Sequence, residues 1–160
     1  MKSSAARLPV LSLRNLDVQF SGSPVTVLDS ISLTLHAGET LALVGESGCG
    51  KSITSLALMG LLPSSARING GEMHFNQHDL RQLSARDYAD LRGNQLAMIF
   101  QEPMTSLNPA FTLGDQLSEA VMRHRDCSRR EAMQAALEIL EKVQIPAAEM
   151  RLKAYPHQLS

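Results

Sequence analysis

Short apolar runs separated by turn residues fill the first part of the chain and predict β-strands. The first three candidate strands lie at residues 10–13, 16–20 and 30–35. In the third of these, Ile31, Leu33 and Leu35 alternate with polar residues and therefore share one face. Residues 21–24, Ser-Gly-Ser-Pro, are typical of a turn. We expect an antiparallel β layer here.

Two later runs are apolar throughout and differ from these alternating strands. Residues 41–44 read Leu-Ala-Leu-Val and predict a strand at 40–44, and residues 96–100 read Leu-Ala-Met-Ile-Phe. A helix is expected between them from Lys51 to near Leu62, because Pro63 cannot continue it. Two apolar strands with a helix between them indicate a buried parallel core sheet.

The stretch between this helix and the second apolar strand has weaker patterns. It predicts a loop at residues 66–71, a short strand at 72–76 and a short helix at 88–92 that Gly93 closes. These elements would connect the two strands of the core sheet.

After residue 111 the apolar spacing becomes helical. A first helix is expected from Thr112 to about Arg125. Ser128 and Glu131 form a capping-box pattern that starts a second helix, which must stop before Pro146. The apolar stripes of both helices indicate core packing, with a docking face for a partner as the alternative.

The stretch Gly45-Glu46-Ser47-Gly48-Cys49-Gly50-Lys51-Ser52 fits the pattern G-x-x-x-x-G-K-[ST]. A strand precedes it and a helix follows it, which is the arrangement that turns backbone N–H groups inward around a phosphate. Lys51 would bring a mobile positive charge to the β- and γ-phosphates. Ser52 would offer its hydroxyl to a Mg²⁺ ion. The sequence therefore predicts a phosphate-binding loop.

Composition narrows the class of protein. The chain has 160 residues, 44% hydrophobic and 19% charged, with a formal net charge of −1, which gives no general electrostatic reason to bind nucleic acid. It has no apolar run of about 18 residues, and we expect no signal peptide and no transmembrane helix. Two cysteines, Cys49 and Cys127, and scattered histidines indicate neither a disulfide framework nor a dedicated metal site.

With the loop, two further stretches resemble the nucleotide-binding domain of ABC transporters. The sequence from Gln101 to Pro109, QEPMTSLNP, is similar to the Q-loop of the dipeptide, oligopeptide and nickel importer ATPases. Residues 155–160, Tyr-Pro-His-Gln-Leu-Ser, resemble the start of the signature motif of that subfamily. The resemblance extends from about Val10 to Ser160 and implies an α/β fold with a P-loop NTPase core sheet, an N-terminal antiparallel β layer and a helical subdomain.

The resemblance also implies roles for two residues outside the loop. Gln101 would complete the Mg²⁺ shell and orient the attacking water, so Lys51 and Gln101 are the candidate catalytic residues and Ser52 and Gln101 the candidate metal ligands. Phe20 stands where the family has an aromatic residue that stacks on adenine. The implied cofactors are ATP and Mg²⁺.

Domain organisation follows from the same resemblance. Residues 1–9 would be a flexible N-terminus and residues 10–160 an incomplete nucleotide-binding domain. Within it, residues 10–100 would form the β layer and P-loop core, 101–155 the Q-loop and helical subdomain, and 156–160 the start of the signature. The later family motifs, including the Walker B aspartate and the catalytic glutamate, have no counterpart, so we expect an uncovered apolar face and weak or no ATP turnover.

The implied partners are membrane-spanning permease subunits, a second nucleotide-binding domain and, indirectly, a periplasmic solute-binding protein, with no nucleic acid. The expected location is the cytoplasmic face of the inner membrane. The transported solute stays open between peptides and related small molecules. The alternatives are another P-loop NTPase or kinase, an ABC protein acting on ribosomes or DNA, and a truncated fragment without catalytic activity.

Overall fold

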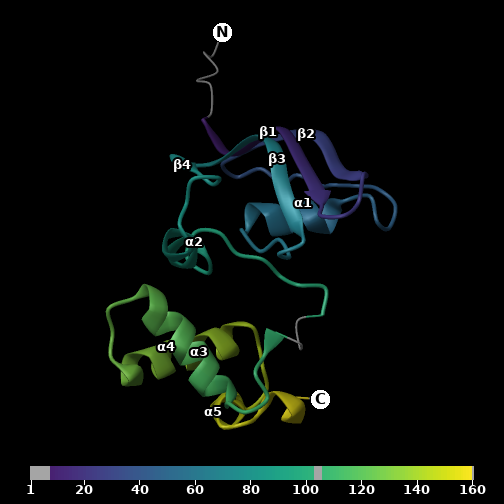
Figure 1. The fold of residues 1–160 in the computed structure, drawn as a ribbon. Helices are drawn as coiled ribbons and strands as arrows, with labels where there is room; N and C mark the ends of the chain where they lie inside the picture. The colour runs from purple at the N-terminus through teal and green to yellow at the C-terminus, as the bar shows by residue number, and fades with distance from the viewer. Residues whose placement is uncertain (1–7, 103–105, 160) are drawn as a thin grey trace. The chain divides into compact units, whose positions relative to one another are not determined.

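A computed structural model describes residues 8–102 and 106–159 of the chain (Figure 1). These residues form two compact units, one ending at Arg92 and the other beginning at Gly93. The predicted flexible N-terminus falls mostly outside the described residues. So do residues 103–105 of the Q-loop stretch and Ser160 of the signature.

The first unit contains an antiparallel sheet whose described strands have the order β2-β1-β3-β4. The strands are β1 (Pro9–Phe20), β2 (Thr26–His36), β3 (Ala66–Phe75) and β4 (His78–Asp79). The long strand β1 lies in the middle and pairs with both β2 and β3. The expected antiparallel β layer is therefore confirmed, with the two candidate strands at 10–13 and 16–20 joined into one.

Alternating apolar residues of these strands form the core of the first unit. The fully buried side chains include Leu13, Leu16 and Val18 of β1, Leu28 of β2 and Met73 of β3. Helix α1 (Lys51–Leu58) lies alongside the sheet in Figure 1 and begins where Gly50 meets Leu28. The sheet therefore fixes the position at which this helix starts.

Two boundaries in this unit differ from the prediction. The loop expected at residues 66–71 is wrong, because β3 already begins at Ala66, which pairs with Phe20 at the end of β1. Cross-strand pairing here outweighs the weak strand preference of the local sequence. Helix α1 ends at Leu58 rather than near Leu62, since Gly60 has a φ of +61° and leaves the helical conformation before Pro63.

The predicted strands at residues 40–44 and 96–100 are also wrong for this structure. Neither segment belongs to a strand, and several of their apolar side chains are exposed, with Val44 at 93% and Ile99 at 92%. A strand needs a hydrogen-bonded neighbour to hold its conformation. No described strand pairs with either segment. The exposed side chains agree with the expected uncovered apolar face.

Helix α2 (Ala85–Leu91) closes the first unit and extends the short helix predicted at 88–92 toward its start. Arg92, directly after it, donates from Nε to Met59 O at 2.7 Å and from Nη2 to Gly60 O at 2.8 Å. Its guanidinium also lies 5.0 Å from the centre of the Tyr88 ring. Arg92 thereby joins the end of α2 to the carbonyls at the C-terminal end of α1.

The second unit is helical, as predicted. It contains α3 (Leu113–His124), α4 (Arg129–Lys142), α5 (Ala148–Leu152) and the 3₁₀ turn η2 (Pro156–Gln158). The capping box of Ser128 and Glu131 is present at the start of α4. A Cβ on Gly114 of α3 would lie 2.8 Å from Leu152 O and 2.9 Å from Met133 Sδ, so the glycine permits close packing of the three helices.

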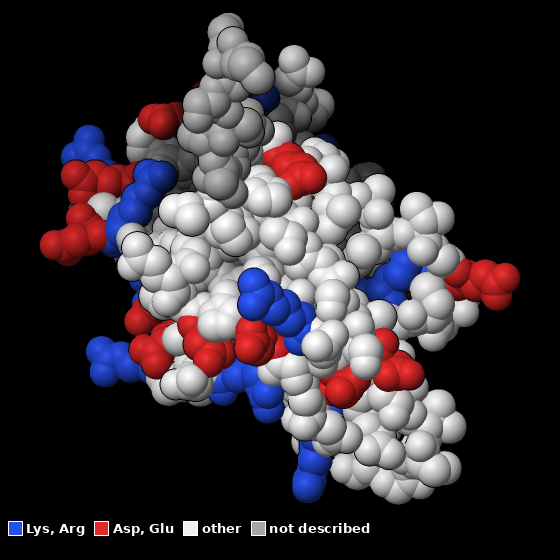
Figure 2. Space-filling model, turned by 90° about the horizontal axis from the view of Figure 1, so that it is seen from above, with Lys and Arg blue, Asp and Glu red and all other residues white. Residues whose placement is uncertain are grey.

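On the face shown in Figure 2, basic and acidic side chains lie next to one another around the margin. The middle of this face is largely uncharged. In the part of the chain that the structure describes, no helix is long and apolar enough to cross a membrane.

Candidate phosphate-binding loop

The glycine loop leads directly into α1. Gly50 is the N-cap of the helix and has a φ of +91°, a left-handed conformation that disfavours residues with a Cβ. A Cβ at Gly50 would also lie 2.5 Å from Leu28 Cδ2 and 3.2 Å from Val27 O. Gly50 is therefore required both by its backbone angle and by its contact with β2.

The Lys51 side chain folds back over the loop instead of extending into solvent. Its Nζ donates to Gly45 O at 2.7 Å and Glu46 O at 2.6 Å, and it lies 3.2 Å from Cys49 Sγ. An ammonium group has three hydrogen-bond donors, so these three contacts account for all of them. The positive charge is thereby held inside the curve of the loop.

The start of α1 differs from the starts of the longer helices α3 and α4. Gly50 provides no side-chain cap, and the first turn contains no acidic residue. By contrast, Thr112 caps α3 and Ser128 caps α4, each with a carboxylate in the first turn. The first N–H groups of a helix need an acceptor. An external anion is the acceptor that suits the uncapped start of α1.

Cys49 is an exposed thiol next to the Lys51 ammonium. The hydrogen bond from Lys51 holds the pKa of this thiol below its ordinary value, because a nearby positive charge and donor favour the thiolate. The sequence pattern alone does not predict this effect.

Thr54 is a further residue of the loop that the sequence reasoning missed. Its side chain is buried, and Oγ1 donates to Gly50 O at 3.1 Å, as does the Thr54 backbone N–H at 2.9 Å. These bonds tie the first turn of α1 to the end of the loop. The available signal was a hydroxyl residue four positions after Gly50.

The structure brings together only some of the predicted site residues. Gly45, Glu46 and Cys49 all contact Lys51, whereas the Ser52 side chain is exposed at the start of α1. Phe20 is half-buried at the end of β1. Gln101 is exposed and belongs to the second unit, so its role stays a prediction.

The loop fits a phosphate group on its own geometry. A Cβ on Gly45 would lie 2.6 Å from Cys49 Sγ, so a side chain at this position would fill the inside of the curve. The Lys51 ammonium and the free end of α1 supply positive charge and donors to the same place. Ser52, the second residue of α1, has an exposed hydroxyl, a group that is a suitable ligand for Mg²⁺.

Comparison with known proteins gives the relatives of this chain. The family model for the ABC transporter matches residues 28–160. The chain is 49% identical over 154 residues to the dipeptide transport ATP-binding protein DppD of Bacillus subtilis, covering 94% of this chain and 46% of that protein. It is 44% identical over 153 residues to the oligopeptide transport ATP-binding protein OppD of Escherichia coli, covering 94% and 45%. The chain thus spans a little under half the length of these relatives.

A solved structure agrees at the level of the fold. The ATP-binding cassette MJ0796, in a dimeric post-hydrolysis state bound to ADP and Pi, matches with a TM-score of 0.74 at 23% identity, covering 94% of this chain and 63% of that one. The predicted α/β class of the P-loop NTPases is confirmed, and the family match excludes an unrelated kinase. The chain belongs to the ABC transporter family.

Proposed function

We propose that this chain is the N-terminal part of the ATP-binding subunit of an ABC importer, which couples MgATP binding and hydrolysis to the uptake of peptides or a related small solute. The names of the relatives support this assignment, since they are dipeptide and oligopeptide transport ATP-binding proteins. The observation that carries it is the Lys51 ammonium held within the curve of a loop that ends at an uncapped helix.

Each residue of the loop has a distinct part in this proposal. The backbone N–H groups at the start of α1 bind phosphate oxygens, and Lys51 offsets their negative charge. Phosphate oxygens carry charge and therefore compete well with the carbonyls of Gly45 and Glu46 for the Lys51 donors. Phe20 offers a ring face to the adenine base.

Ser52 and Gln101 would hold the Mg²⁺ ion, and Gln101 would also orient the attacking water. When bound, Mg²⁺ would supply positive charge that favours transfer of the phosphoryl group. Lys51 and Gln101 are therefore the proposed catalytic residues.

The proposed partners are membrane-spanning permease subunits, a second nucleotide-binding domain and, indirectly, a periplasmic solute-binding protein. The proposed location is the cytoplasmic face of the inner membrane. In this assignment residues 10–100 form the β layer and P-loop core, 101–155 the Q-loop and helical subdomain, and 156–160 the start of the signature motif.

The test is a calorimetric titration of the chain with MgATP. Lys51→Ala should weaken binding about tenfold or more, because it removes a charge-assisted contact to phosphate worth about 1.5–3 kcal/mol. The matched control is Lys142→Ala, which removes an exposed lysine at the end of α4. Equal affinities for Lys51→Ala and the unmodified chain would overturn the proposal.

A further inference from the structure

Helix α1 ends in a glycine turn, and the carbonyls of this turn lie beyond the helical hydrogen bonds. Gly60, with a φ of +61°, donates from its backbone N–H to Ala57 O at 3.0 Å, and Leu61 donates to Leu56 O at 2.8 Å. These two bonds form a Schellman turn, which satisfies carbonyls of the last helical turn. The carbonyls of Met59 and Gly60 come after those acceptors and need donors from another part of the chain.

Arg92, which directly follows α2, supplies both donors. Its Nε donates to Met59 O at 2.7 Å, and its Nη2 donates to Gly60 O at 2.8 Å. A guanidinium can reach two adjacent carbonyls because its N–H groups form a planar, rigid fork. The Tyr88 ring lies against this group, with its centre 5.0 Å from Arg92 Cζ, and the Tyr88 hydroxyl donates to Leu80 O at 2.9 Å.

Gly60 permits this arrangement because it has no side chain. A Cβ at Gly60 would lie 2.8 Å from the Tyr88 ring, so the ring packs directly on the backbone that Arg92 binds. The glycine turn, the ring and the guanidinium therefore form one packed cluster. All of its residues belong to the first unit.

This cluster gives the end of α1 a positive charge that the helix itself lacks. The last turn of α1 contains no basic residue, whereas α3 and α4 both have one there. A cation near the C-terminal end of a helix interacts favourably with the negative end of the helix dipole. Arg92 supplies this cation from outside the helix, and no acidic residue of the first turn occupies the opposite end of α1.

We propose that Arg92 is a positioning residue for phosphate binding, which holds α1 at its C-terminal end so that the N–H groups at its start stay aligned. The helix has 8 residues, about two turns, and so short a helix is marginal without outside support. Release of its last turn would leave little more than one turn behind the glycine loop. The inference rests on the proposed function, because its ligand is the phosphate that this loop would bind.

Calorimetric titration of the 160-residue chain with MgATP and with magnesium pyrophosphate tests this role. Arg92→Gln removes the cation and the fork of donors, and it should weaken both ligands about three- to tenfold, the usual size for a residue that acts through its packed neighbours. Pyrophosphate has no base, so similar losses for both ligands would place the effect at the phosphates. Arg92→Lys keeps the charge without the fork and should restore part of the affinity.

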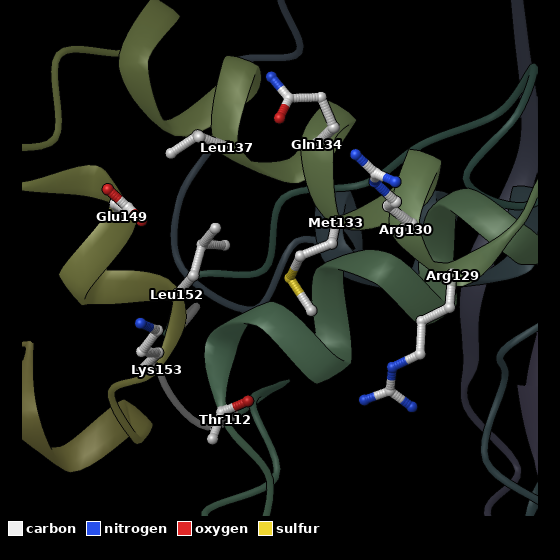
Figure 3. Close-up of a pocket in the computed structure, with 9 residues that line it drawn as sticks. All are labelled: Thr112, Arg129, Arg130, Met133, Gln134, Leu137, Glu149, Leu152 and Lys153. Atoms are coloured by element: carbon white, nitrogen blue, oxygen red, sulfur yellow. The ribbon is translucent and has the colours of Figure 1, made fainter.

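Two variants are matched controls. Arg130→Gln removes an exposed arginine that lines a groove of the helical unit (Figure 3), and it should leave both affinities unchanged. Ser84→Ala removes the side-chain cap of α2 and destabilises the first unit without removing the Arg92 contacts. It should lower the midpoint of urea unfolding but leave both affinities unchanged, because the folded chain keeps its binding site.

Amide hydrogen exchange gives a measurement that needs no nucleotide. The backbone N–H of Thr54 donates to Gly50 O at 2.9 Å and therefore reports the first turn of α1. Relative to the amides of β1, which report opening of the sheet, this amide should exchange faster in Arg92→Gln than in the unmodified chain. Arg92→Lys should give an intermediate rate.

The possible results separate this inference from the nucleotide proposal. Normal affinity for both ligands in Arg92→Gln, or unchanged exchange of the Thr54 amide, would overturn the inference. So would an equal loss of affinity in Ser84→Ala, because general destabilisation would then explain it. If the unmodified chain binds neither ligand, the proposed function fails, and the Thr54 exchange rate still decides whether Arg92 holds the start of α1. If Arg92→Gln does not fold, equal affinities for Arg92→Lys and the unmodified chain would contradict the role of the fork.

Discussion

At the scale of single residues, the contact between Cys49 Sγ and Lys51 Nζ favours the thiolate form of Cys49. The Lys51 hydrogen bond lowers the Cys49 pKa, so a larger thiolate fraction is present at neutral pH than for an ordinary cysteine. Alkylation by iodoacetamide in a Cys127→Ser background should reach half its maximal rate at a lower pH than for a free thiol.

Lys51→Ala tests the cause of this reactivity. It should move the midpoint of the rate profile to higher pH, because the donor and the positive charge are both removed. MgATP should slow the reaction in the unmodified loop. An unchanged midpoint in Lys51→Ala would show that Lys51 does not activate the thiol.

Gly50 gives a second prediction at this scale. Gly50→Ala should lower the free energy of unfolding by about 2–4 kcal/mol, since it adds a left-handed backbone cost of about 1–2 kcal/mol to the overlap with Leu28. Gly22→Ala is the matched control, with a φ of +82° and no atom near its Cβ, and should show only the backbone cost. Urea denaturation measures both, and equal losses would contradict the overlap.

At the scale of elements, carboxyl groups in the first turns of α2, α3 and α4 make the free energy of unfolding depend on pH. Hydroxyl hydrogen bonds from Ser84, Thr112 and Ser128 lower the pKa values of the carboxyl groups three residues later. A carboxylate with a lowered pKa in the folded state stabilises it above the unfolded pKa of about 4. That contribution is lost as pH falls through the folded value.

The chain should therefore lose stability as the pH falls below about 4, beyond what unperturbed carboxyl groups would cause. The variant with Asp87→Asn, Asp115→Asn and Glu131→Gln should show a flatter dependence. Glu119→Gln, on an exposed position of α3, serves as the control. Urea midpoints measured across this range decide the matter, and a triple variant as acid-sensitive as the unmodified chain would refute the prediction.

How well the sequence predicts each element depends on how far away in the sequence the residues that stabilise it lie. The helix start at Lys51 and the box at Ser128 depend on neighbours within a few positions, and both are present as expected. β3 was misread at Ala66 because its strand conformation depends on β1, far away in the sequence. The close packing of Gly114 with Met133 and Leu152 needs three helices together, so no local pattern could indicate it.

At the scale of the whole molecule, two observations concern ATP hydrolysis. Apolar side chains are exposed, and the chain spans less than half the length of its relatives. Val44 and Ile99 are almost fully exposed, and the sequence contains no adjacent Asp-Glu pair after an apolar run. A missing general base commonly lowers a rate by about 10²- to 10⁴-fold. We therefore expect the 160-residue chain to bind MgATP but to hydrolyse it far more slowly than an intact transporter does.

Phosphate release measured with purified chain tests this expectation. Lys51→Ala identifies any release that comes from a contaminating ATPase, because only release by this chain depends on Lys51. Release at the rate of an intact transporter ATPase, lost in Lys51→Ala, would show that the general base is present among these residues.

Arg92 gives the first unit a direct link between the ends of helices α1 and α2. It is the last residue of the first unit. Its guanidinium donates hydrogen bonds to the carbonyls of Met59 and Gly60, which follow α1 and lie 33 and 32 positions earlier in the chain. One side chain therefore links the residues that follow α1 to the end of α2 within the first unit.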